Sequence, residues 1–386
     1  MTDGRPLRVA TVITRLDGGA GQHALRGARV LDPAEFTMTI ITGSGGQLLA
    51  EAVAAGLEVV VEPSLRAPIA PANDLRALTR LSTLLRRRQF DVVHTHCAKA
   101  GALGRLAAHR ARVPRLVHTY HGFPFHEFQG AARRQGYIQI ERRLGRITDV
   151  ALCVGTGVAV EAVRRRLIAP ERVRTIGVVA DGADQAAARP PPAAARRRRA
   201  RAELGLPADA TVVGAVGRLT YQKAPEDFLA ALRALGRPGV TGVWVGDGEL
   251  AGQVAARAAG LPGNQLVLAG QRSNVPDLLP AFDVFALPSR YEGLPTVVVE
   301  AMVCGIPVVA TAVNAVGDVV IPGETGLLVP PGRPELLAEA VGFLLDSPDA
   351  AARMAATARA RLGTRFGEQA LRGALVAAYS GGYAVA

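Results

Sequence analysis

Residues Phe282–Thr311 read FDVFALPSRYEGLPTVVVEAMVCGIPVVAT, and this stretch decides the fold class. The apolar run Val284–Leu287, closed by a proline, predicts a buried parallel strand. After a loop, a helix is expected from about Pro295 to Cys304, with a proline in its first turn and a glycine just past its end. The run Ile306–Ala310 predicts another buried strand. Strand, helix and strand in this order predict an α/β protein with a parallel sheet.

Two glutamates stand eight positions apart in this stretch, Glu292 at the carboxyl end of the predicted strand and Glu300 inside the predicted helix. At about 1.5 Å per residue the spacing is about two helical turns, so both carboxylates can reach one crevice. Open α/β sheets bind ligands beyond the carboxyl ends of their strands, and a carboxylate there suits paired sugar or ribose hydroxyls. The alternative is two exposed surface glutamates, but the apolar residues around Glu300 favour a partly buried carboxylate that needs a partner.

The length and composition limit the fold and the partners. A chain of 386 residues with 49% hydrophobic residues suits two domains with full cores. The net charge of +12 favours anionic partners such as nucleotide diphosphates or a membrane surface, although a bias toward arginine and alanine is an alternative source of this charge. With 4% aromatic residues, no surface of interleaved basic and aromatic residues is indicated, so nucleic acid is not an expected partner. The oligomeric state stays open.

The amino terminus lacks the basic start and long apolar stretch of a signal peptide, and no run approaches about 18 apolar residues. We therefore expect a cytoplasmic protein. A basic amphipathic helix over Asp74–Arg88 leaves open a peripheral contact with the inner face of the membrane. The more common role of such a helix is to pack its leucines on the core and keep its arginines in water.

The rest of the N-terminal half repeats the strand–helix pattern. Apolar runs predict strands at residues 7–13, 36–42, 57–62, 91–95, 115–120, 150–154 and 173–178, with helical patterns between them. This repetition predicts a doubly wound parallel sheet. After the first strand, Thr14–Gln22 (TRLDGGAGQ) forms a glycine-rich turn that leads into a helix and can present backbone N–H groups to an anion.

The clearest break in composition is Ala183–Arg201, ADQAAARPPPAAARRRRAR, which predicts an exposed linker. Its arginine run either binds phosphates or, as we favour, is the solvated start of the next helix. The pattern then restarts with a strand at Thr211–Val216 and the loop GRLTYQK (217–223). Arg218 and Lys223 therefore stand at a strand's carboxyl end and before a helix N-terminus, where two fixed cations suit a diphosphate.

These motifs resemble those of a known family. The stretch EGLPTVVVE (292–300), followed by GIPVVAT, is similar to the E-x7-E signature of the family 4 glycosyltransferases, which are retaining enzymes of the two-domain GT-B fold. The loop 217–223 resembles the G-R-x3–6-K phosphate clamp of that family. HTHCAKAG (94–101) and HTYHGFPFH (118–126) resemble the members that build polysaccharides. The resemblance covers nearly the whole chain.

The resemblance implies two Rossmann-like domains that face each other across a cleft. An acceptor-binding domain is expected over residues 1–185, with a C-terminal helix at about 366–386 that packs back on it. A nucleotide-sugar-binding domain is expected over residues 186–365.

The resemblance also implies a role for individual residues. Arg218, Lys223, Glu292 and His121 are the expected catalytic residues. The two cations would hold the diphosphate as it leaves, because positive groups that meet the charge developing on the β-phosphate lower the barrier. Glu300 would bind the ribose hydroxyls, and Glu292 and His121 would contact the transferred sugar. Substrate contacts are implied for Gly19, Ala20, Gly21, Gly217, Arg272, Val275, Gly293, Leu294, Pro295, Thr296 and Glu300.

Two segments depart from the family pattern. The loop that usually reads G-G-A-[EQ] has alanine at its second position here, at Ala20. Where many members have two glycines and a glutamate, this chain has Asn314, Ala315 and Asp318, so the role of that loop is open.

The expected activity is that of a hexosyltransferase. A hexosyl or N-acetylhexosaminyl group would pass, with retention, from a UDP-sugar to a hydroxyl of a glycan, a lipid-linked precursor or a small metabolite such as an antibiotic. No cofactor beyond the nucleotide sugar and no metal is expected, because Arg218 and Lys223 replace the metal; His94 and His96 share a strand face but lack an evident third ligand. The alternatives are a UDP-sugar 2-epimerase, which should lack the E-x7-E motif, and a non-catalytic nucleotide-sugar sensor.

Overall fold

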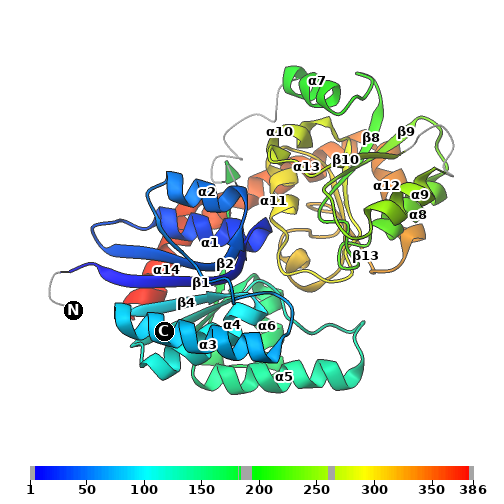
Figure 1. The fold of residues 1–386 in the computed structure, drawn as a ribbon. Helices are drawn as coiled ribbons and strands as arrows, with labels where there is room; N and C mark the ends of the chain where they lie inside the picture. Colours follow the sequence, from blue (N-terminus) through cyan, green and yellow to red (C-terminus); the bar gives the residue numbers. More distant parts are fainter. Residues whose placement is uncertain (1–4, 181, 184–193, 260–265, 382–386) are drawn as a thin grey trace. The chain divides into compact units, whose positions relative to one another are not determined.

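The computed structural model describes residues 5–180, 182–183, 194–259 and 266–381. The chain divides into two compact units: unit 1 is Met1–Val179 with Glu368–Ala386, and unit 2 is Ala180–Gly367. Each unit is built on one parallel sheet flanked by helices (Figure 1). The predicted α/β class, with a Rossmann-like parallel sheet in each half of the chain, is confirmed.

The described part of unit 1 holds a seven-stranded sheet in the order β3-β2-β1-β4-β5-β6-β7, and each neighbouring pair is parallel. Its middle strands are buried on both faces, which explains why they read as near-continuous apolar runs. The strands are β1 Leu7–Leu16, β2 Phe36–Gly45, β3 Glu58–Val61, β4 Val92–His96, β5 Arg115–Tyr120, β6 Val150–Val154 and β7 Val173–Ile176.

The helices of unit 1 connect successive strands, except for the last one, which comes from the carboxyl end of the chain. They are α1 Gly18–Val30, α2 Gln47–Ala54, α3 Pro71–Arg88, α4 Ala98–Ala111, α5 Ala131–Arg146, α6 Thr156–Arg164, the 3-10 turn η1 Pro170–Arg172, and α14 Glu368–Ser380. Helix α14 packs against α1 and buries Leu371, Leu375 and Tyr379. A Cβ at Gly27 of α1 would lie 3.1 Å from Leu375 Cδ1, so the glycine permits the close approach of the two helices.

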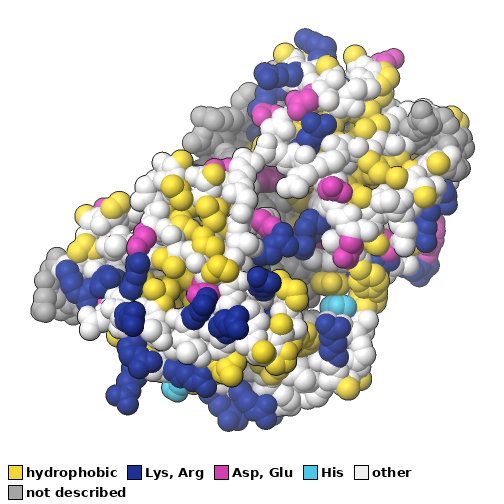
Figure 2. Space-filling view, viewed as in Figure 1, with side chains coloured by type: hydrophobic (Ala, Val, Ile, Leu, Met, Phe, Trp, Pro, Cys, Tyr) yellow, Lys and Arg dark blue, Asp and Glu magenta, His cyan; other side chains and the backbone are white. Residues whose placement is uncertain are grey.

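Helix α3 uses its apolar face for the core of unit 1. Leu78, Leu81 and Leu85 are buried there, and only Leu75 among its leucines is strongly exposed. Basic side chains gather on the face of unit 1 that carries α3 and α5 (Figure 2). The core-packing role favoured from the sequence is the one that the structure shows. Among the described residues, no helix combines the length and the apolar character needed to cross a membrane.

The described part of unit 2 holds a six-stranded parallel sheet in the order β10-β9-β8-β11-β12-β13. The strands are β8 Thr211–Val216, β9 Val240–Val245, β10 Leu266–Gly270, β11 Val284–Leu287, β12 Val308–Thr311 and β13 Leu327–Val329. The helices are α7 Ala194–Glu203, α8 Pro225–Leu235, α9 Ala251–Ala258, α10 Val275–Leu278, α11 Thr296–Val303, α12 Pro334–Asp346 and α13 Pro348–Leu362, with 3-10 turns η4 Leu279–Ala281, η5 Asn314–Asp318 and η6 Gly363–Phe366.

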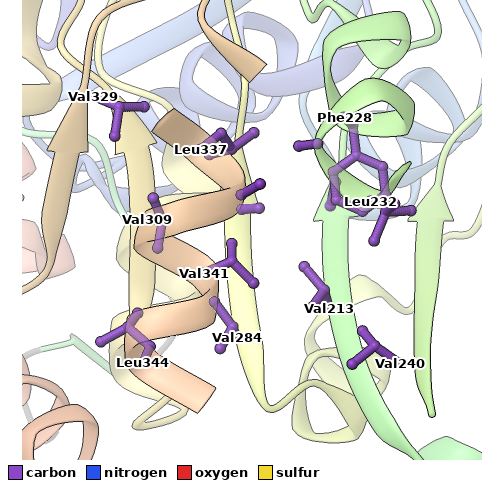
Figure 3. Close-up of a cluster of buried hydrophobic side chains, with 14 of the residues drawn as sticks. Val213, Phe228, Leu232, Val240, Val284, Val309, Val329, Leu337, Val341 and Leu344 are labelled. Atoms are coloured by element: carbon purple, nitrogen blue, oxygen red, sulfur yellow. The ribbon is translucent and has the colours of Figure 1, made fainter. Parts of the chain in front are cut away.

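The main core of unit 2 lies where α8 and α12 cover one face of this sheet. Figure 3 shows Phe228 and Leu232 of α8 and Leu337 and Val341 of α12 pointing toward the strands, with Val213 of β8 among them. This core includes residues of both β8 and β11, the two strands in the middle of the sheet, so it holds these strands in place.

Strand order reverses once in each sheet. In unit 1 the reversal lies between β1 and β4, and in unit 2 it lies between β8 and β11. The loops after these strands leave in opposite directions, so a crevice opens at the carboxyl end of each pair, and ligands of doubly wound sheets bind there.

The arginine run predicted to be a solvated helix start lies in α7, and one of its members is not solvated. Arg201 is 3% exposed, and its Nη2 lies 2.9 Å from Asp283 Oδ2. Its Nε donates to the carbonyl of Ala281 at 3.2 Å, and Arg197 pairs with the same Asp283 carboxylate. The run thus fastens α7 to the segment that leads into β11. The prolines of the predicted linker (190–192) lie outside the described residues.

Candidate active site

The switch point of unit 2 carries an ion pair between two of the predicted catalytic residues. Lys223 follows β8 and Glu292 follows β11, and Lys223 Nζ lies 2.5 Å from Glu292 Oε1. The two side chains are 16% and 6% exposed, respectively. The structure therefore brings together a cation and a carboxylate that are 69 residues apart in sequence.

Glycines shape the loop that carries Lys223. Gly217 has φ +157°, and a Cβ there would lie 3.1 Å from Lys223 Cδ, so the lysine stem packs directly over the glycine. A Cβ at Gly246 would lie 2.1 Å from the carbonyl oxygen of Gly217, which closes that position to any side chain. Trp244 Nε1 donates to the same carbonyl at 2.8 Å. The backbone under Lys223 is thus held by a buried indole and by close packing with the loop after β9.

Arg290 joins the Lys223 loop to the Glu292 loop. Its backbone N–H donates to Gln222 O, and its Nη1 donates to Tyr221 O, both at 2.8 Å. The guanidinium also contacts Glu226 at 3.0 Å and Asp227 at 3.2 Å, at the start of α8. Arg290 was not among the residues predicted for the site, although an arginine after a strand end and an acidic pair at a helix start are a readable signal.

Two amide side chains hold the segment around Glu292. Gln222 Nε2 donates to Tyr291 O at 3.0 Å and approaches Glu292 Oε2 at 3.3 Å. From η5, Asn314 Nδ2 donates to the carbonyl of Glu292. Asn314 has φ +42°, a left-handed conformation that asparagine tolerates better than most residues. The loop whose role the sequence left open therefore anchors Glu292.

The remaining donor-side residues of this loop lead into α11. Gly293, Leu294 and Pro295 are buried, and Thr296 begins the helix. The expectation that Pro295 lies in the first turn is wrong: its φ and ψ are extended, and it caps the helix from outside. Glu300 lies inside α11 and is partly buried, as predicted.

The other predicted donor contacts are Arg218, Arg272 and Val275. Arg218 is exposed, and it lies close enough to Tyr291 to oppose the rise that burial causes in the pKa of that phenol. Arg272 donates its Nε to Ala269 O at 2.9 Å, and Val275 begins α10. Both follow β10, the edge strand two places from β8. Among the described residues, neither forms a hydrogen bond or an ion pair with Lys223 or Glu292.

In unit 1, the predicted glycine-rich turn is largely helical. Strand β1 runs on to Leu16, and α1 already begins at Gly18, so Gly19, Ala20 and Gly21 form its first turn. The prediction of a loop at these positions is wrong, because the chain turns within Asp17 and Gly18, the latter at φ +60°. The N–H groups of a first helical turn still lack intrahelical acceptors and can meet an anion.

Histidines cluster around the switch point of unit 1. His121 directly follows β5, and its Nε2 lies 2.9 Å from Nδ1 of His96, the last residue of β4. His23 of α1 packs edge-on against His121, with ring centroids 5.2 Å apart. Burial lowers the pKa of His23 to about 4, with Arg26 adding to the effect. Burial and the neighbouring imidazoles also lower the pKa of His96 and of His121, so these rings are neutral at pH 7.

The other two histidines of the cluster have hydroxyl partners. His94 contacts Tyr379 Oη through Nδ1 and Thr119 Oγ1 through Nε2, both at 2.7 Å. His118 contacts Thr95 Oγ1 through Nδ1 at 2.8 Å. Across the residues that the structure describes, no group of three or more His, Cys, Asp or Glu side chains is placed to hold a metal ion.

The fold and the site define a class: proteins with a Rossmann-like parallel sheet in each half and a paired lysine and glutamate at a switch point. Within it, the chain belongs to the family 4 glycosyltransferases and is a glycosyltransferase. The family model described as "Glycosyltransferase Family 4" matches residues 17–178, and that described as "Glycosyl transferases group 1" matches residues 196–361. The family predicted from the sequence motifs is therefore confirmed.

Curated relatives carry related names. An Escherichia coli protein named UDP-Gal:alpha-D-GlcNAc-diphosphoundecaprenol alpha-1,3-galactosyltransferase is 29% identical, over 77% of this chain and 76% of its own. A D-inositol 3-phosphate glycosyltransferase from Xylanimonas cellulosilytica is 34% identical, over 75% of this chain and 72% of its own. Among solved structures, Anabaena HepE in complex with UDP and glucose superposes with a TM-score of 0.83 at 22% identity, covering 97% of this chain and 100% of that one. This last likeness supports the fold.

Proposed function

We propose that the protein transfers a hexosyl or N-acetylhexosaminyl group from a UDP-sugar, with retention, to a hydroxyl of a glycan, a lipid-linked precursor or a small metabolite. The observation that carries the proposal is the contact between Lys223 and Glu292 at the switch point of unit 2. The names of the relatives support it, because one specifies a UDP-galactose donor with a diphosphoundecaprenol acceptor and others specify inositol phosphate.

On the donor side, Lys223 and Arg218 stabilise the diphosphate. Charge grows on the leaving phosphate as the glycosidic bond breaks, and an ammonium fixed by packing over Gly217 needs little reorganisation to meet it. Glu292 holds Lys223 before the donor arrives and then accepts hydrogen bonds from the donor sugar. Glu300 accepts those of the ribose hydroxyls. Backbone N–H groups at the start of α11 add donors for the sugar or its phosphate.

On the acceptor side, unit 1 binds the acceptor and unit 2 the nucleotide sugar. The first turn of α1 at Gly19–Gly21 contributes contacts of unit 1. His121 contacts the transferred sugar. No metal is required, since Lys223 and Arg218 supply the positive charge. The basic face of α3 and α5 (Figure 2) is a candidate for peripheral contact with an anionic membrane, which a lipid-linked acceptor would make useful.

An epimerase on the same scaffold is the less favoured alternative, because this chain keeps Glu292 and Glu300 at the E-x7-E spacing. A non-catalytic sensor would bind the donor without turnover.

The test begins with thermal denaturation in the presence of UDP-, GDP- and ADP-sugars, since a ligand that binds only the folded chain at 100 times its Kd stabilises it by about 2.7 kcal/mol. Sugars that raise the melting temperature are then assayed for transfer, with and without EDTA. Glu292→Gln should lose at least about 100-fold in transfer while the protein stays folded. Glu335→Gln is the matched control, because Glu335 forms a surface ion pair with Arg333 in the same unit. If Glu292→Gln and Glu335→Gln were equally active, the role given to Glu292 would be wrong.

A further inference from the structure

The histidine cluster contains a pair whose protons can be assigned. His96 ends β4 and His121 follows β5, the adjacent strand, and their facing nitrogens are 2.9 Å apart. One proton therefore lies between Nδ1 of His96 and Nε2 of His121. A neutral imidazole has one N–H donor and one acceptor nitrogen, so the position of this proton fixes the tautomer of both rings.

The surroundings of His96 decide where the proton lies. His96 is 2% exposed, and among the described residues its Nε2 is buried without a hydrogen-bond partner. If His96 carried its proton on Nε2, a donor N–H would be buried unsatisfied, and orphaned buried N–H groups are rare in native structures. If the proton is on Nδ1, it donates to His121, and only an acceptor lone pair stays unmatched. The second arrangement leaves no N–H group of His96 without an acceptor, so we expect it to have the lower free energy.

The assignment carries through to His121. When His121 Nε2 accepts from His96, the ring's own proton must be on Nδ1. His121 is partly exposed, and its Nδ1 has no hydrogen-bond partner among the described residues. The Nδ1–H group is therefore the donor that this ring has left for a ligand.

Backbone geometry supports a functional reason for this placement. Cys97, directly after His96, has φ +63° and ψ 169°, a region that is essentially restricted to glycine. At the corresponding junction after β6, Gly155 has φ +101° and ψ 164°, so there the chain does use glycine. Strain of this kind persists where the surrounding structure demands it, and it clusters at functional sites.

His23 restricts the pair from a third element. It lies on α1, is 6% exposed, and packs edge-on against both rings, with centroids 5.2 Å from His121 and 6.5 Å from His96. A ring in that position limits the rotation of His121, so the packing of His23 and the hydrogen bond to His96 together restrict its orientation.

We propose that His96 is a positioning residue that holds His121 in its Nδ1–H tautomer, so that His121 offers the transferred sugar or its phosphate a hydrogen-bond donor. The inference rests on the proposed function, and it deepens that function by giving His121 a defined role. With Nε2 engaged by His96 and Nδ1 protonated, the neutral ring has no free acceptor nitrogen. It cannot serve as the base that deprotonates the acceptor hydroxyl.

The test is a long-range 15N–1H NMR correlation spectrum of the full chain with 15N-labelled histidine, in which protonated and unprotonated ring nitrogens have well-separated shifts. The His121 signals are assigned by their loss in His121→Asn. The expected wild-type result is a neutral His121 with a protonated Nδ1. A protonated Nε2 would overturn the proposal. This NMR measurement requires neither enzyme activity nor a folded His96 variant.

Variants then separate positioning from structure. His96→Asn places an amide N–H near the position of Nδ1, and it should keep the tautomer and most of the transfer rate. His96→Leu removes the donor; it should shift His121 toward Nε2–H and lower kcat by about 10-fold or more with KM for the nucleotide sugar little changed, the scale seen when an imidazole loses its orienting partner. His109→Asn is the control, since His109 is an exposed residue of α4 outside the histidine cluster.

The outcomes distinguish this inference from the proposed function. If His121 has the expected tautomer but no nucleotide sugar is turned over, the transferase mechanism fails and the positioning role stands. If transfer occurs and the tautomer in His96→Leu is unchanged, the positioning role fails.

Discussion

Lys223 Nζ lies 2.5 Å from Glu292 Oε1, and the pair spans the ends of β8 and β11, the two strands at which the strand order of unit 2 reverses. The contact couples the cation assigned to the diphosphate to the carboxylate assigned to the donor sugar. Each group holds the other in place, and each becomes an unpaired and mostly buried charge if its partner is removed.

Removing the lysine alone should therefore affect both stability and activity. We expect Lys223→Ala to lower the free energy of unfolding by about 3 kcal/mol, because Glu292 is left charged and buried, and to lower kcat/KM by about 100-fold or more. The double variant Lys223→Ala/Glu292→Gln should recover most of the stability and none of the activity. Urea denaturation and a transfer assay measure the two quantities.

The control for this pair is Arg333→Ala, which breaks the exposed pair with Glu335 and should change stability by less than about 1 kcal/mol. A double variant that regained transfer along with stability would mean that Lys223 only neutralises Glu292.

Arg290 should be needed for the geometry of both loops. Its guanidinium is 12% exposed and contacts Glu226, Asp227 and the carbonyl of Tyr221. We expect Arg290→Ala to cost about 3 kcal/mol of stability, since it leaves two acidic groups without their partner. Arg290→Lys should recover only part of this loss, because an ammonium cannot reproduce the planar set of donors. Chemical denaturation measures the effect, together with KM for the nucleotide sugar, which should rise in both variants.

The matched control for Arg290 is Arg237→Ala, which removes an exposed pair with Asp346 at 2.5 Å in the same unit. Equal losses in the Arg290 and Arg237 variants would contradict the linking role of Arg290.

Asn314 combines a hydrogen bond with a left-handed backbone, and two substitutions separate these contributions. Asn314→Gly removes only the bond to the Glu292 carbonyl, whereas Asn314→Ala also places an alanine at φ +42°. We expect Asn314→Ala to be less stable than Asn314→Gly by about 1 kcal/mol. Both should raise KM for the donor, as measured by initial rates. If the alanine variant were the more stable one, the left-handed conformation of Asn314 would be in question.

The histidine cluster should make unit 1 sensitive to acid. The pKa of His23 falls from an ordinary 6.5 to about 4 in the folded chain, because of burial and the nearby Arg26. The neutral ring is thus the folded form, and its contribution to stability is complete above pH 6.5 and lost as the pH falls toward 4. At about 1.4 kcal/mol per pH unit, His23 alone accounts for about 3 kcal/mol over this range.

Other buried histidines act in the same direction, since burial also lowers the pKa of His94, His96, His118 and His121. The melting temperature should therefore fall steeply between pH 6.5 and pH 5. His23→Leu should make that slope shallower, and an unchanged slope would show that His23 is not buried neutral in the folded chain.

The sequence predicted the Lys223–Glu292 site because parallel sheets impose it. Each residue lies in the loop that follows an apolar run, and the carboxyl ends of neighbouring parallel strands meet at one edge. The contacts that anchor the two loops, made by Arg290, Gln222 and Asn314, were not predicted, because they depend on loop conformations that no periodicity encodes.

The errors have local causes. Glycines signalled a turn at Gly19–Gly21, but the helix α1 incorporates them, because the reversal is complete at Gly18. The arginine run looked solvated, yet Arg201 is buried against Asp283, a residue 82 positions away. Sequence patterns report which faces are apolar, and they do not report which charges find distant partners.

Tyr379 of α14 contacts His94, which lies two residues before His96 on β4. The last helix of the chain is therefore part of the scaffold of the first unit. During synthesis, the whole of unit 2 is made before α14 can complete the histidine cluster of unit 1. The first unit therefore cannot finish folding before the second is synthesised, whereas the N-terminal domain of a tandem protein commonly folds first.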